Sequence, residues 1–130
     1  MNTKLLMTSS SLAFGLAGMV ALFVPEAFLP AERSGGSQIS VLVQLMGTLY
    51  FAFALMNWTA KDSAIGGIYA RPVSLANFAH FFSGTLLLTR YQLSNELNGY
   101  ILAVLVTYAI FAALFYWLVF RATGLKSSSS

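Results

Sequence analysis

Four long stretches of the chain consist almost entirely of apolar side chains and contain no Asp, Glu, Lys or Arg. They run over residues 5–24, 39–58, 73–89 and 99–120. A helix needs about 20 residues, with a range of about 17–25, to cross the hydrocarbon core of a bilayer. The pattern therefore predicts an all-α protein in which one membrane domain, residues 1–130, forms a bundle of four transmembrane helices.

The residues that flank these stretches favour helix ends. Pro25 and Pro30 follow the first stretch, and a proline lacks the backbone N–H that a helix interior needs. Pro72 precedes the third stretch, where the first turn of a helix tolerates proline. Lys4 before the first stretch is also typical of a secretory signal peptide, but this apolar run is long and no small-x-small cleavage site follows it. We therefore expect the first helix to be retained, and we expect the serine tail 127–130 to be disordered.

Composition favours lipid as the solvent. The chain is 58% hydrophobic and 8% charged, whereas a soluble domain carries about 25% charged residues. Its net charge of +3 comes from basic residues scattered singly, so no nucleic-acid-binding patch is predicted. The absence of Cys excludes disulfides and cysteine-ligated clusters within this sequence, and a metal or haem site with two His ligands would need a second chain.

The basic residues also orient the predicted helices, because cytoplasmic loops of membrane proteins are enriched in Lys and Arg. An N-terminus in the cytoplasm places five basic residues inside and two outside. The inner set is Lys4, Lys61, Arg71, Arg121 and Lys126, and the outer set is Arg33 and Arg90. Trp and Tyr side chains near both predicted boundaries agree with this arrangement. We expect an N-in/C-in topology.

Polar side chains within the spans lie mainly on the middle two. In the second span, Gly47, Tyr50, Ala54 and Asn57 recur at helical spacing on one face, and Gln44 extends that face outward.

In the third span, Ser74, Asn77, His80 and Gly84 form a similar stripe. Tyr50 lies eight residues before Trp58, and His80 lies eight residues after Pro72, so both are at a depth of roughly 12 Å. If the two stripes face each other, the Tyr50 hydroxyl meets the His80 ring.

His80 has three interpretations. It is a neutral imidazole that links two helices, or it contacts a quinone or another lipid-like molecule, or it is a single axial ligand to a tetrapyrrole pigment shared with a partner. The second interpretation predicts a ligand pocket lined by His80, Tyr50, Asn77, Asn57 and Gln44.

The cytoplasmic segment between the second and third spans is the most distinctive loop. Gly66 and Gly67 permit a tight bend. Tyr69 is expected at the membrane interface, and Lys61 and Arg71 are expected to meet lipid phosphates or a partner subunit. The alternative is an ordinary loop with basic ends.

Small residues predict close helix packing at Ser11, Gly15 and Gly18 in the first span, and at Gly47 and Gly84 in the middle spans. The fourth span is rich in large aromatic residues, including Tyr108, which we interpret as packing or lipid-facing positions.

Recognisable catalytic patterns are absent from the sequence. No span contains a carboxylate, and the chain has no phosphate-binding Gly-rich loop, His-rich metal motif or nucleophile elbow. We therefore predict no catalytic residue, no metal site and no cofactor held by this chain alone. The alternative is a quinone, lipid or pigment that this chain shares with a partner.

The number of spans, the chain length and the small-residue content resemble the small four-helix bacterial inner-membrane proteins of the DoxX type, although residues 66–72 depart from their pattern. The resemblance implies a bacterial inner membrane. We expect an accessory or structural subunit of a larger membrane complex, whose partners are the bilayer and other membrane subunits or further copies. The alternatives are a binding protein for a hydrophobic small molecule and a DoxX-like or quinone-linked enzyme subunit.

Overall fold

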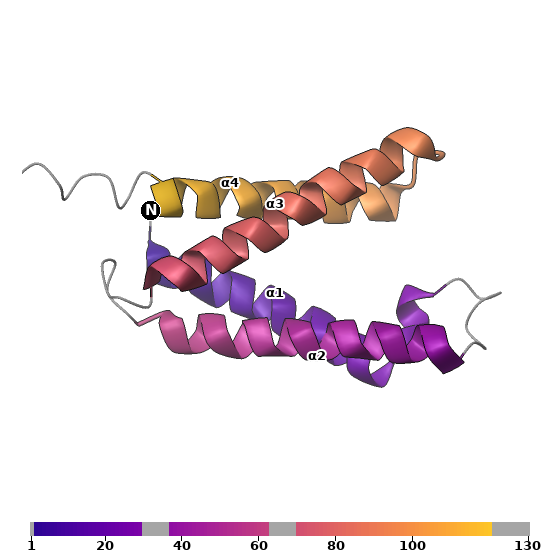
Figure 1. Ribbon diagram of the computed structural model, residues 1–130, viewed down its shortest axis with the longest axis horizontal. Helices are drawn as coiled ribbons and strands as arrows, with labels where there is room; N and C mark the ends of the chain where they lie inside the picture. Colours follow the sequence, from indigo (N-terminus) through magenta and orange to yellow (C-terminus); the bar gives the residue numbers. More distant parts are fainter. Residues whose placement is uncertain (1, 30–36, 63–69, 121–130) are drawn as a thin grey trace, which may run out of the picture. The chain divides into compact units, whose positions relative to one another are not determined.

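A computed structural model describes residues 2–29, 37–62 and 70–120 of the chain (Figure 1). This part of the chain is helical and contains no strand, which confirms the all-α prediction for it. Its elements are α1 (Thr3–Phe23), the short 3-10 helix η1 (Pro25–Phe28), α2 (Ser37–Ala60), α3 (Ala70–Ser94) and α4 (Gly99–Phe120).

Two compact units make up the chain, Met1–Asp62 with α1, η1 and α2, and Ser63–Ser130 with α3 and α4. Several predictions concern residues outside the described ranges. These are Pro30, Arg33, Gly66, Gly67, Tyr69, Arg121, Lys126 and the serine tail 127–130.

Within the described residues, three helices are long and apolar enough to cross a membrane, namely α1, residues Gln38–Ala60 of α2, and α4. These helices identify a membrane protein by length and composition. At 25 residues, or about 37 Å, α3 is also long enough for a span. It is less apolar than the others, however, because Asn77 and His80 lie within its apolar run and Arg71 and Arg90 flank that run. The crossing by α3, and with it the four-span count, stays a prediction.

Side-chain caps explain where two of the helices begin. The Asn2 side-chain oxygen accepts hydrogen bonds from the backbone N–H groups of Lys4 and Leu5, at 3.1 and 3.3 Å. The Asn98 side chain accepts from Tyr100 and Ile101 at the start of α4, at 3.0 and 3.3 Å. Each asparagine satisfies N–H groups that have no partner within the helix.

The first unit is an antiparallel hairpin in which α1 and α2 lie side by side (Figure 1). Phe14 of α1 is buried and packs against two aromatic rings of α2, with ring centroids 5.6 Å from Tyr50 and 5.3 Å from Phe53. These contacts lie near the middle of both helices and hold their apolar faces together.

The second unit pairs α3 with α4, again antiparallel. Phe81 of α3 is buried, and its ring stacks on Phe111 at 4.8 Å and on Phe115 at 5.9 Å. Phe115 is completely buried. Closer to the start of α3 and the end of α4, the ring centroids of Phe78 and Tyr116 lie 5.8 Å apart. Aromatic residues of α4 therefore form much of the contact with α3.

Many large apolar side chains remain exposed on the helices. Leu16 of α1 is 69% exposed, Phe23 is 74% exposed and Leu87 of α3 is 69% exposed. Contiguous apolar surfaces are rare on soluble monomers and mark contacts with lipid or protein. The exposed apolar side chains therefore agree with a lipid environment.

Candidate functional site

A buried polar cluster joins α1 to α2 in the first unit. Asn57 is completely buried, and its side-chain nitrogen donates a hydrogen bond of 3.0 Å to the hydroxyl oxygen of Ser10. The Ser11 hydroxyl donates 2.7 Å to the backbone carbonyl of Ala54. Two side chains of α1 thus engage α2 within one turn, where water is excluded.

The small residues predicted for helix packing lie at this same interface. A Cβ atom added at Gly18 would lie 2.9 Å from both the Gly47 carbonyl oxygen and the Phe51 backbone nitrogen. A Cβ added at Gly47 would lie 2.9 Å from the Leu22 backbone nitrogen. Gly15 differs, because its nearest neighbour would be the Ala54 Cβ at 3.6 Å, an ordinary contact.

Gln44 lies closer to the connection between α1 and α2. Its side-chain nitrogen donates a hydrogen bond of 3.2 Å to the backbone carbonyl of Leu22. Leu22 belongs to the last turn of α1, where carbonyl groups have no partner within the helix. In the structure Gln44 therefore satisfies a helix end, and Tyr50, one of the other predicted pocket residues, packs on Phe14.

His80 meets a tyrosine of α4 in the second unit. Its Nε2 atom lies 3.2 Å from the Tyr108 hydroxyl, and the tautomer of the imidazole decides which of the two groups donates. The Tyr108 ring also contacts Phe81 edge to face, with centroids 5.2 Å apart. A Cβ added at Gly84 would lie 2.5 Å from two atoms of the Tyr108 ring. The missing side chain of Gly84 thus lets that ring lie against α3, where its hydroxyl reaches His80.

The other two polar residues of this stripe are buried on α3. The Asn77 side-chain nitrogen donates 2.8 Å to the Val73 carbonyl, one turn earlier in the same helix, and Ser74 is also buried. The predicted contact between Tyr50 and His80 would join the two units, and it stays a prediction.

Sequence reasoning did not identify two members of these clusters. The sequence pattern indicates a packing role for Tyr108, although its hydroxyl meets His80 in the structure. Ser10 is not evident from the sequence, because Ser9, Ser10 and Ser11 are consecutive and their order does not show which of them bond to α2. In the structure both Ser10 and Ser11 bond to α2, because the rotation of α1 turns both toward that helix.

Charged groups meet at the end of the first unit where α1 begins and α2 ends. The Lys4 Nζ atom lies 2.7 Å from Asp62 Oδ1, with both side chains largely exposed. The hydrogen bond from Lys4 lowers the pKa of the Asp62 carboxyl below its ordinary value, and the charge of Lys61 acts in the same direction. Lys61 itself lies over the Trp58 ring, with Nζ 2.9 Å from the ring centroid.

We expect the Lys4→Gln substitution to raise the Asp62 pKa toward its ordinary value, because the hydrogen bond from Lys4 is the largest cause that lowers it. Because the carboxyl pKa is lowered in the folded chain, the ion pair contributes stability above the ordinary pKa, and this contribution disappears as the pH falls through the lowered value. Carbon-13 NMR titration of the Asp62 carboxyl measures the change directly. An identical titration curve in the wild-type and Lys4→Gln proteins would contradict the pairing. The effect on stability should be small, because both groups are exposed.

No group of three or more His, Cys, Asp or Glu within residues 2–29, 37–62 and 70–120 could hold a metal ion. Comparisons with protein-family models, with curated proteins and with solved structures find no match for this chain. The interpretation of the clusters therefore depends on their own geometry.

Proposed function

We propose that this protein crosses the membrane four times with both termini in the cytoplasm, and that it is an accessory or structural subunit of a larger membrane complex. It acts through helix packing rather than through chemistry of its own. The proposed location is a bacterial inner membrane, in line with the resemblance to DoxX-type proteins.

The observation that carries this proposal is that polar side chains of the helices form hydrogen bonds to the facing helix of the same hairpin. Asn57 bonds to Ser10, Ser11 bonds to a backbone carbonyl of α2, and His80 meets Tyr108. Each of these bonds joins one helix of a hairpin to the other. Interhelical hydrogen bonds of this kind contribute about 0.6–2 kcal/mol within a membrane. A catalytic site would instead direct such groups at a substrate.

The exposed surface of α1 supports a role in assembly. Its large apolar side chains recur along the helix, and the most exposed members are Leu5, Leu12, Leu16 and Phe23. Either lipid or an apolar face of another membrane subunit can cover these apolar side chains. In the proposed complex a neighbouring subunit covers part of it.

Site-specific photo-crosslinking in the native membrane tests the assembly role. We expect a photoreactive residue at Leu16, which is 69% exposed, to form an adduct of one defined mass with another membrane protein or a second copy. The matched control is the same residue at Phe115, which is 0% exposed and should give no adduct. Lipid adducts alone from Leu16, together with a monomer on gentle-detergent purification, would contradict the proposal.

Single cysteines test the crossing by α3, and the natural chain contains no Cys that would interfere. Asp62 and Glu96 are exposed. In the sequence Asp62 precedes α3, and Glu96 follows it. We expect a membrane-impermeant maleimide to label Glu96→Cys in intact cells and to label Asp62→Cys only after lysis. Labelling of both variants from the same side would show that α3 does not cross.

A further inference from the structure

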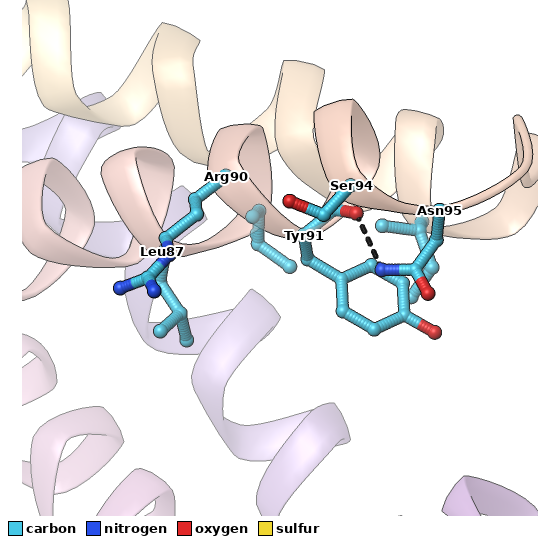
Figure 2. A pocket seen from close by; sticks show the side chains of 7 residues that line it. Leu87, Arg90, Tyr91, Ser94 and Asn95 are labelled. Carbon is cyan, nitrogen blue, oxygen red and sulfur yellow. Dashed lines mark hydrogen bonds between the residues drawn. The ribbon is translucent and has the colours of Figure 1, made fainter.

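A groove opens at the end of the second unit where α3 approaches α4. Its volume is about 510 Å³, and its lining combines polar and apolar side chains (Figure 2). The lining includes Leu87, Arg90, Tyr91 and Ser94 of α3, Asn95 directly after that helix, and Ile101 of α4. Ligand pockets commonly measure about 300–1,000 Å³, so the groove is large enough to hold part of an amphiphile.

The groove contains a cation without a described counter-charge. Among the residues that the structure describes, the one ion pair joins Lys4 to Asp62, so no carboxylate of this part of the chain neutralises Arg90. Glu96 is the one acidic residue of the second unit. Asn95 is held in place by its side-chain nitrogen, which donates 2.8 Å to the Tyr91 carbonyl (Figure 2).

The order of side chains along the groove matches the order of groups in a phospholipid. Leu87 lies at the end closer to the predicted span, and Ser94 and Asn95 lie beyond Arg90 toward the connection to α4. Arg90 itself directly follows the apolar stretch 73–89. Tyr91 is 50% exposed, and tyrosine is enriched at the level of lipid headgroups. An arginine at that level is suited to a phosphate, which it binds through two parallel hydrogen bonds.

We propose that this groove binds an anionic phospholipid, with its phosphate on Arg90 and an acyl chain along Leu87. Ser94 supplies a hydroxyl, which donates to headgroup oxygens. Inorganic phosphate is a poorer occupant, because it satisfies Arg90 but leaves the apolar wall in contact with water. Binding at this groove is independent of the assembly role proposed above, because that role rests on contacts within the hairpins and on the face of α1.

Native mass spectrometry of the full chain in detergent, titrated with phosphatidylglycerol, tests the proposal. We expect Arg90→Gln to weaken phosphatidylglycerol binding by at least about tenfold, or about 1.4 kcal/mol, because it removes the charge-assisted hydrogen bonds to the phosphate. The matched control is Lys4→Gln, which removes a basic group that Asp62 already neutralises at 2.7 Å and which should change binding by less than about twofold. Phosphatidylcholine should bind more weakly than phosphatidylglycerol to the wild-type protein.

Three outcomes would overturn the proposal. Equal losses in Arg90→Gln and Lys4→Gln would indicate general attraction between basic residues and anionic lipid. Displacement of phosphatidylglycerol by an equal concentration of inorganic phosphate would assign the site to the free ion. If Arg90→Gln does not fold, as judged by circular dichroism, Ser94→Asp replaces it, because Ser94 is exposed and a carboxylate there repels phosphate. Unchanged lipid affinity in Ser94→Asp would equally exclude the site.

Discussion

Replacing Gly18 or Gly47 with alanine should lower the free energy of unfolding by about 1–3 kcal/mol, the usual range for overpacking. The added Cβ would lie 2.9 Å from backbone atoms of the facing helix. Backbone atoms cannot rotate away as a side chain can, so α1 and α2 must separate. That separation also stretches the bonds from Ser11 to Ala54 and from Asn57 to Ser10, which lie on the same interface. Denaturant unfolding in detergent micelles, followed by circular dichroism, measures the loss.

Gly15→Ala is the matched control for this experiment. It makes the same chemical change on the same helix, less than one turn from Gly18, but its Cβ would meet Ala54 at an ordinary 3.6 Å. Alanine is favoured over glycine in a helix by about 1 kcal/mol, so Gly15→Ala should be neutral or stabilising. Opposite signs at Gly15 and Gly18 are thus expected. If all three alanine variants were equally stable, the close approach of α1 to α2 would be wrong.

Gly84→Ala should destabilise the second unit by about 1–3 kcal/mol, because the new Cβ would displace the Tyr108 ring. Moving that ring takes its hydroxyl away from His80 Nε2, which lies 3.2 Å from it. The same substitution in a Tyr108→Ala background should cost nothing, since the ring is no longer there. Unfolding of the four proteins of this double-mutant cycle measures the coupling between the two positions.

Tyr108→Phe separates the hydrogen bond from the packing. It keeps the ring against Gly84 and removes only the hydroxyl, so we expect a loss of about 0.6–2 kcal/mol. A Gly84→Ala cost that is the same with and without the Tyr108 ring would disprove the contact. A Tyr108→Phe protein as stable as wild type would instead show that the bond to His80 contributes nothing to stability.

These glycines show how far small residues can be interpreted from a sequence. Gly15, Gly18, Gly47 and Gly84 look alike as small positions in apolar helices, and all four were predicted as packing sites. In the structure Gly18 and Gly47 meet backbone, Gly84 accommodates an aromatic ring, and Gly15 has an ordinary neighbour. The residue type indicates that a close approach is possible, whereas the facing atoms decide what approaches.

For the candidate site too, the sequence indicates some residues and only the structure shows their partners. His80, Asn57 and Gln44 attract attention in the sequence because polar side chains are rare in apolar spans, and the structure gives each of them a polar partner. The partners themselves were not predicted. Ser10 is one of three consecutive serines, and Tyr108 is one of several aromatic residues in the same helix, so the sequence does not distinguish either of them. Partner choice depends on helix rotation, and each residue turns a helix by about 100°.

The sequence by itself determined that this chain is helical, and it placed the helices to within a few residues. The apolar stretch 5–24 corresponds to the helix Thr3–Phe23, and residues 99–120 correspond to the helix Gly99–Phe120. The stretch 73–89 became Ala70–Ser94, because backbone hydrogen bonds continue beyond the apolar residues. Length, apolar content and caps are local properties, so a single sequence records them.

Only the tertiary structure decided which helix faces meet within each hairpin. A helix that is apolar all round carries no amphipathic stripe to mark its buried side. The position of the neighbouring helix, and not the residue type, then decides whether a leucine faces lipid or packs in the hairpin. For that reason Phe115 is buried and its neighbour Tyr116 exposed, although both are aromatic residues of one apolar helix.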